Sequence, residues 1–167
     1  MRKILIIGVV LLAICVSLSA VSADDSWSFN WSSSDSSNSD GGEMSFENGK
    51  LKLQGLEFNI PDGYKENESA RVLAQPADDI DGAKYSACRF VNGDKEIVIN
   101  VFFSDSNNFD SLEPANDTQV EKTMAGFKGI FMEDQYGDGT PTFEYLKDGK
   151  IAKVNAPDVS TIESVIK

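Results

Sequence analysis

The pattern of apolar and polar residues is clearest between Tyr85 and Phe103, where two strand-like runs meet at Asn92-Gly93. Asn-Gly supplies the positive backbone φ that a tight hairpin turn needs, and β-branched and aromatic residues dominate both flanks. The second run is apolar on both faces, with Ile97, Ile99, Val101 and Phe103 on one and Val98 and Phe102 on the other. This pattern predicts a central strand that is covered on both sides.

Shorter runs with the same alternation lie on either side of this hairpin. Asn48-Gly49 separates MSFE from KLKL, and LEFNI follows before a turn at Pro61-Asp62-Gly63. Asp148-Gly149 separates two later runs in the same way. The sequence predicts three short strands within residues 44–60 and a meander over residues 119–124, 127–133, 142–147 and 150–155.

Helical periodicity is confined to short stretches. The sequence predicts a helix of two turns over Ser69 to Gln75, stopped by Pro76. It also predicts one helical turn in the polar loop from Ser104 to Asn116. At the C-terminus, Ser160 and Glu163 predict a capping box. The apolar face of this last helix holds Val159, Ile162, Val165 and Ile166. The expected fold class is α+β, an antiparallel β-sheet of hairpins and a meander with a C-terminal amphipathic helix packed on it, in two layers or a sandwich.

The first 23 residues have the features of a secretory leader. Met1, Arg2 and Lys3 form a short positive region, and residues 4–23 carry no charge and end in Val21-Ser22-Ala23 before Asp24. An uncharged run of this length is also long enough to span a bilayer. We therefore predict a cleaved signal peptide at residues 1–23, with an uncleaved transmembrane anchor as the alternative.

Residues 24–42, DDSWSFNWSSSDSSNSDGG, predict a flexible Ser-rich spacer, because they hold too little apolar surface to offset the entropy of ordering. Trp27, Phe29 and Trp31 would share one face of a strand and could dock on the domain, on a neighbouring chain or on a membrane interface. Residues 43–167 are long enough for a single globular domain with one core. The expected location is secreted or on the outer face of the cell envelope.

The chain is strongly acidic, with 15 Lys and Arg against 27 Asp and Glu and a formal net charge of −12. Removal of the leader takes away Arg2 and Lys3 and makes this −14. Such a surface repels nucleic acid and anionic headgroups, so we expect no nucleic-acid partner, and membrane contact only through an uncleaved leader. Its expected effect is solubility, with binding of cations or of a basic partner as the alternative.

Histidine and cysteine content excludes several kinds of site. The chain has no His, and Cys15 lies in the leader, so Cys88 is the one cysteine left after cleavage. An internal disulfide, a zinc site and a Ser-His-Asp or Cys-His arrangement therefore lack their components. We predict no catalytic residue and no cofactor. Cys88 shares a strand face with Ser86 and Phe90 and is predicted to be a small buried side chain.

Two loops are acidic enough for calcium to be considered. With Gly139 at the sixth position of a calcium loop, Asp134 and Asp138 match positions one and five, but tyrosines stand at positions three and twelve. The loop before Gly82 fails similarly. We predict no standard calcium site; looser coordination remains a hypothesis, by Asp134 and Asp138 or by Asp78, Asp79 and Asp81.

Three Asn-X-Ser/Thr sequons follow the leader. All lie in the predicted spacer or in predicted loops, where a glycan fits. The candidate N-glycosylation sites, in a host that attaches such glycans, are Asn30, Asn67 and Asn116.

Several motifs together carry a family resemblance: FNIPDGY at residues 58–64, KTMAGFKG at 122–129, and FEYLKDGKIAKVNA at 143–156 before a short terminal helix. With the leader and spacer, they resemble a recurrent small domain of secreted proteins in methanogenic archaea. More distantly, the layout is similar to the α/β sandwich of photosystem PsbP proteins and of bacterial envelope lipoproteins. The resemblance implies an extracytoplasmic domain that binds or assists, and it transfers no functional residue to this chain.

No motif in the chain specifies a reaction. The function we expect is a noncatalytic binding module, secreted or on the cell surface, whose partner the sequence does not identify. The alternatives are a carboxylate-dependent extracellular enzyme or enzyme accessory domain and an N-terminally anchored structural envelope protein.

Overall fold

The computed structural model describes residues 43–78, 80–135, 137 and 139–167. The predicted leader and spacer, with Asn30, lie outside the described residues, as do Asp79 and Asp138. The described residues form two β-sheets and one α-helix at the C-terminal end, so the fold is broadly α+β and mostly antiparallel sheet. Within the described part of the chain, no helix has the length and apolarity needed to cross a membrane.

The smaller sheet contains three strands in chain order: β1 (Met44–Glu47), β2 (Lys50–Leu53) and β3 (Leu56–Asn59). Both connecting turns have two residues with positive φ, Asn48 with Gly49 and Gln54 with Gly55. This is the backbone of the tight hairpin turn that matches strand twist. The Asn-Gly dipeptide predicts the first turn from sequence alone. The Gln-Gly dipeptide at the second turn is a weaker sequence signal for a hairpin. The sheet buries one face, with Leu51, Leu53, Leu56 and Phe58 at most 1% exposed.

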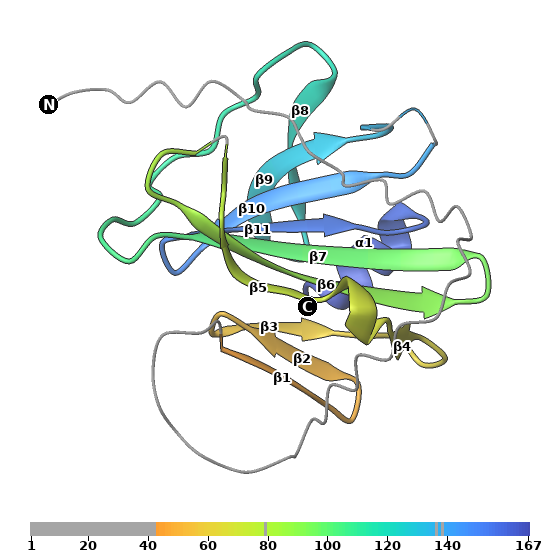
Figure 1. Cartoon of the computed structure of the whole chain (residues 1–167). Coiled ribbons are helices and arrows are strands. Elements are labelled where there is room, and N and C mark those ends of the chain that lie inside the picture. The colour runs from red at the N-terminus through yellow and green to blue at the C-terminus, as the bar shows by residue number, and fades with distance from the viewer. Residues whose placement is uncertain (1–42, 79, 136, 138) are drawn as a thin grey trace, which may run out of the picture. The chain divides into compact units, whose positions relative to one another are not determined.

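The larger sheet is antiparallel throughout and has the order β4-β6-β7-β11-β10-β9-β8, with β5 pairing the other end of β6 (Figure 1). Its edges are β4 and β5 on one side and β8 on the other. The strands are β4 (Lys65–Glu66), β5 (Val72–Pro76), β6 (Lys84–Asn92), β7 (Lys95–Phe103), β8 (Gln119–Met124), β9 (Phe127–Met132), β10 (Thr142–Lys147) and β11 (Lys150–Asn155).

The hairpin of β6 and β7 turns at Gly93-Asp94, because Asn92 is still paired with Lys95, so the turn predicted at Asn92-Gly93 lies one residue later in the structure. β7 lies inside the sheet between β6 and β11. Ile97, Ile99 and Val101 on its core face are fully buried. On its other face Val98 and Phe102 are half-buried. The strand is therefore central, with one face covered completely and the other in part.

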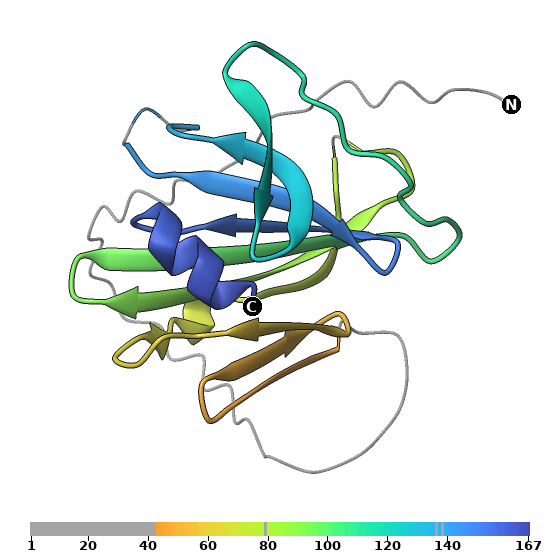
Figure 2. The same cartoon turned by 180° about the vertical axis from the view of Figure 1, so that it is seen from behind.

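The core lies between one face of the larger sheet and a second layer made by the smaller sheet and α1 (Val159–Val165). Figure 2, seen from behind Figure 1, shows α1 lying against this face, with β3 next to it. The helix contributes Ile162 and Val165, which are fully buried. Phe46 of the smaller sheet meets Phe90 of the larger one edge to face, with ring centroids 4.9 Å apart.

The predicted helix from Ser69 to Gln75 is wrong. A single 3₁₀ turn, η1, covers Glu68–Ala70, and the chain then extends into β5. Val72 pairs with Ala87 of β6, and a bulge at Ala74 places its backbone N–H 2.9 Å from the hydroxyl of Ser86, which accepts its hydrogen bond. Pairing with β6 therefore overrides the weak local helical preference.

Two smaller helical predictions are also wrong. Residues 104–116 contain no turn of helix, and the segment crosses between β7 and β8 as an irregular loop. At α1 the cap is Asp158 instead of Ser160. The Asp158 carboxylate accepts hydrogen bonds from the Ser160 hydroxyl at 2.7 Å and from the Thr161 backbone N–H at 2.7 Å, and these bonds lower its pKa. A carboxylate accepts more donors than a serine hydroxyl can, so the helix starts two residues earlier.

Candidate functional site

A hollow of about 320 Å³ lies where the crossing loop, residues 104–118, passes over β8, β9 and β10. The loop contributes residues 110–113. The strands contribute Glu121, Lys128, Gly129, Ile130 and Leu146. Ile130 alternates along β9 with the core residue Phe131, so the hollow lies on the face of the larger sheet that points away from the core.

The loop is tied to the sheet on both sides of the hollow. Before it, the Phe109 backbone N–H donates to the Gly149 carbonyl at 2.9 Å, in the turn between β10 and β11. After it, the side-chain oxygen of Gln119 accepts from the Ala115 backbone N–H at 2.6 Å. The loop therefore holds residues 110–113 in place over the strands.

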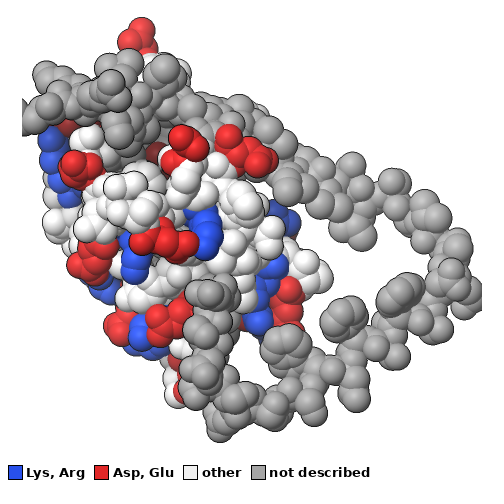
Figure 3. All heavy atoms as spheres, turned by 60° about the vertical axis from the view of Figure 1, so that its left-hand side comes forward, with Lys and Arg blue, Asp and Glu red and all other residues white. Residues whose placement is uncertain are grey.

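The hollow combines an apolar floor with an acidic rim. Ile130 is 2% exposed and lies at its base. At the rim, Lys128 and Glu121 form an ion pair at 2.9 Å, with side chains 71% and 51% exposed. Asp110 and Glu113 add two further carboxylates. The rim is therefore net negative, with Asp110, Glu113 and Glu121 against Lys128. Acidic and basic side chains are interspersed on the face of the molecule seen in Figure 3.

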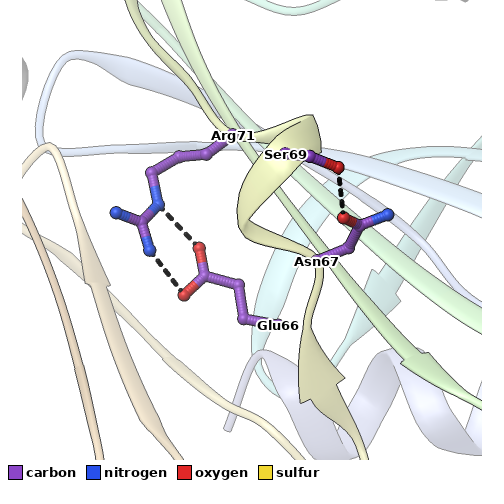
Figure 4. Close-up of polar contacts among 4 residues, drawn as sticks. All are labelled: Glu66, Asn67, Ser69 and Arg71. Carbon is purple, nitrogen blue, oxygen red and sulfur yellow. Dashed lines mark hydrogen bonds and ion pairs between the residues drawn. The ribbon is translucent and has the colours of Figure 1, made fainter. Parts of the chain in front are cut away.

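A second polar cluster surrounds η1 at the sheet edge. Arg71 donates two hydrogen bonds of 2.8 Å to the two carboxylate oxygens of Glu66 (Figure 4). The Glu66 side chain is 8% exposed and that of Arg71 29%. The hydrogen bonds from Arg71 to Glu66 raise the pKa of the guanidinium. This buried carboxylate is fully engaged, since both its oxygens face a guanidinium in the two-pronged geometry.

Cys88 lies near this pair and is fully buried, as predicted. Burial raises the pKa of its thiol to about 12, with a further contribution from the negative charge of Glu66 that Arg71 partly offsets. A thiol with this pKa stays protonated at neutral pH and is a poor nucleophile. The structure therefore gives Cys88 a packing role.

The acidic loops proposed for calcium are described only in part. One carboxylate oxygen of Asp134 accepts a hydrogen bond from the Gly139 backbone N–H at 2.9 Å, which closes the turn. The neighbouring Gln135 side-chain oxygen is buried without a hydrogen-bond donor among the described residues. Asp78 and Asp81 are exposed. The described residues contain no group of three metal-ligating side chains, and the two looser ligand sets stay predictions because Asp79 and Asp138 lie outside the description.

Sequence reasoning did not single out the residues of the hollow. Asp110, Glu113, Glu121 and Lys128 look like ordinary polar positions, because the loop and the strands that bring them together are distant in sequence. The available signal was the length of the connection between β7 and β8, since loops this long without secondary structure are often functional.

Comparisons of this chain with protein-family models, with curated proteins and with solved structures found no match. The resemblance to secreted domains of methanogens and to PsbP-like domains therefore stays a prediction from sequence motifs.

Proposed function

We propose that the domain is a noncatalytic binding module that works outside the cytoplasm and holds its ligand in the hollow under the crossing loop. The observation that supports this most strongly is the pairing of an apolar floor with an acidic rim beneath a loop anchored on both sides. Its volume of about 320 Å³ lies at the lower end of the range for small-ligand sites.

The rim indicates the chemistry of the ligand. Asp110, Glu113 and Glu121 outnumber Lys128, so the hollow favours a primary amine or a guanidinium carried on a short apolar body. A lysine or arginine side chain of a partner protein has this form. Exposed ion pairs contribute little free energy, so most of the affinity would come from burying the apolar part over Ile130.

The enzyme alternative has less support. A carboxylate that transfers protons generally works where water is excluded. In the hollow, the Glu121 and Lys128 side chains are more than half exposed and pair with each other. Glu66, the most buried carboxylate in the described ion pairs, is held by Arg71. Neither arrangement resembles an acid and base positioned for reaction.

An NMR titration tests the proposal. Diaminopentane is added to the isotope-labelled chain, with pentanediol as the neutral ligand of the same length. We expect larger amide shifts in residues 110–113 and 128–130 with the diamine than with the diol, and a smaller difference between the two at high salt. The double variant Asp110→Asn, Glu113→Gln should bind about tenfold more weakly, a loss of about 1.4 kcal/mol.

The matched control is Glu47→Gln, Asp81→Asn, which makes the same change in charge at exposed positions outside the hollow. Equal weakening in both double variants would show that net charge, and not the hollow, governs binding. Shifts confined to other surfaces would contradict the proposed site.

A further inference from the structure

Two of the three sequons lie in the described part of the chain and share one local geometry. The side-chain oxygen of Asn116 accepts a hydrogen bond from the Thr118 hydroxyl at 2.6 Å and from the Thr118 backbone N–H at 3.0 Å. The side-chain oxygen of Asn67 accepts one from the Ser69 hydroxyl at 2.7 Å (Figure 4). In both sequons the hydroxyl contacts the amide oxygen, and the amide nitrogen makes no hydrogen bond to the described residues.

The surroundings of Asn116 leave it accessible. Residues 113–118 are exposed, and they precede β8 without pairing to any strand. The turn is closed by the Gln119 backbone N–H, which donates to the Asn116 carbonyl at 3.1 Å. Lifting this segment would break that bond and the bond from the Ala115 backbone N–H to the Gln119 side chain, but residues 113–118 have no buried side chain to expose.

Asn67 is held much more firmly. It is half-buried, and its backbone N–H donates to the Arg89 carbonyl of β6 at 2.8 Å. The 3₁₀ turn η1 follows it, and the Glu66–Arg71 ion pair joins the residues on either side of that turn. Opening the sequon would break the contact with β6 and expose the largely buried Glu66 carboxylate.

From these two settings we infer that the folded chain is an acceptor for N-linked glycan at Asn116, and that the fold protects Asn67 although it carries the same motif. An enzyme that glycosylates a folded protein has to draw the sequon into its own active site, so the cost of local opening decides which asparagine reacts. The inference is independent of the binding role proposed for the hollow.

The donor class is a lipid-linked oligosaccharyl phosphate, bound by the transferring enzyme. The side-chain nitrogen of Asn116 attacks the anomeric carbon of the donor and forms the new C–N bond. The bond from that carbon to the phosphate oxygen breaks, and its electron pair leaves with the phosphate. One amide proton passes to a base of the transferase, and nothing is oxidised or reduced.

The test uses the purified full chain, a single-subunit oligosaccharyltransferase that accepts plain Asn-X-Ser/Thr sites, and its lipid-linked glycan. The enzyme is chosen for modifying both sequons in a tryptic digest of the same chain, which provides the unfolded reference. Site occupancy is read by peptide mass spectrometry. We expect occupancy at Asn116 of the folded chain to exceed that at Asn67 by about tenfold, and the digest to show similar occupancy at both.

Two variants identify the cause. Thr118→Ala should abolish modification at Asn116 and leave Asn67 unchanged, because it removes the sequon hydroxyl alone. Arg71→Ala should raise occupancy at Asn67 without changing Asn116, because it releases the residues around η1. A folded chain that reacts at neither site, or equally at both, would overturn the inference. So would an Arg71→Ala chain, shown by circular dichroism to be folded, whose Asn67 stays unmodified.

Discussion

At the scale of single residues, the Cys88 thiol and the Tyr145 hydroxyl are buried groups whose pKa values lie above the ordinary ones. Burial is the main cause of the raised pKa in both groups, and at Cys88 the positive charge of Arg71 offsets it only in part. Both groups fit their surroundings in the neutral form, so each links the stability of the fold to pH.

Cys88 gives a prediction for alkaline solution. Between the ordinary thiol pKa of 9.0 and the folded value of about 12, the unfolded chain has lost its proton while the folded chain keeps it. The unfolded state then binds fewer protons, so the free energy of unfolding falls with rising pH in this window, by about 1.4 kcal/mol per pH unit.

Urea unfolding at about pH 8 and about pH 10 measures this loss of stability. The Cys88→Ala variant should lose less stability than the parent over that interval, although its cavity makes it less stable by about 1 kcal/mol at neutral pH. An equal loss in the variant and the parent would show that the thiol keeps its ordinary pKa in the fold.

At the scale of elements, Gly129 sets how closely β9 approaches β10. A Cβ built on it would lie 2.1 Å from the Glu144 carbonyl oxygen and 2.8 Å from the Phe143 ring. The backbone carbonyl of Glu144 cannot move aside as the end of a flexible side chain can. Any side chain at position 129 would therefore push β9 away from β10.

We expect Gly129→Ala to lower the free energy of unfolding by about 3 kcal/mol, as measured by urea denaturation. Gly93→Asn is the control. Gly93 lies in a turn with φ of 64° and open space around it, and Asn tolerates that conformation, so its cost should stay under about 1 kcal/mol. Similar losses in both variants would mean that the close contact with β10 is relieved by small shifts.

The contrast between turns and β5 shows which elements a sequence can reveal. Asn48-Gly49 and Asp148-Gly149 specify their turns through their own backbone preferences, so the hairpins around them are visible locally. β5 depends on Ser86, twelve residues away from Ala74, which satisfies the backbone N–H at the bulge. No pattern within residues 69–75 carries that information, and their local preference pointed to a helix.

The difference between the two sequons and the formation of the hollow both depend on contacts between residues that are distant in sequence. The Asn-X-Ser/Thr motif is local, so the sequence identifies Asn67 and Asn116 as candidates, but it gives no reason to prefer one of them as the glycan acceptor. The preference arises from the Arg89 carbonyl on β6 and the Glu66–Arg71 pair. In the same way, the hollow exists only because residues 110–113 reach strands that come later in the chain.

At the scale of the whole domain, a buried serine joins the two sheets. The Ser86 hydroxyl on β6 accepts hydrogen bonds from the Gln54 side chain of the smaller sheet and from the Ala74 backbone N–H, both at 2.9 Å. The Gln54 carbonyl also accepts a 2.5 Å hydrogen bond from the Lys150 ammonium on β11. The turn between β2 and β3 is thereby fixed to two strands of the larger sheet.

Ser86→Ala should therefore loosen the smaller sheet as a unit. Because the partly buried backbone N–H of Ala74 and the Gln54 side chain both lose their acceptor, we expect a loss of about 2 kcal/mol in the free energy of unfolding. Amide hydrogen exchange measured by mass spectrometry should speed up in β1, β2 and β3 more than in β9 and β10. The exposed Ser45→Ala on β1 should change neither quantity. Uniform acceleration across both sheets would contradict a specific role for Ser86 in joining them.

The position of β11 affects the order in which the larger sheet can form. It is the last strand of the described residues, yet it lies between β7 and β10, in the middle of the larger sheet. Until residues 150–155 are available, β7 and β10 each keep an unpaired edge, and the contacts that complete the sheet join distant parts of the chain. The larger sheet therefore cannot close until the strand at its centre is available, whichever of its other strands pair first.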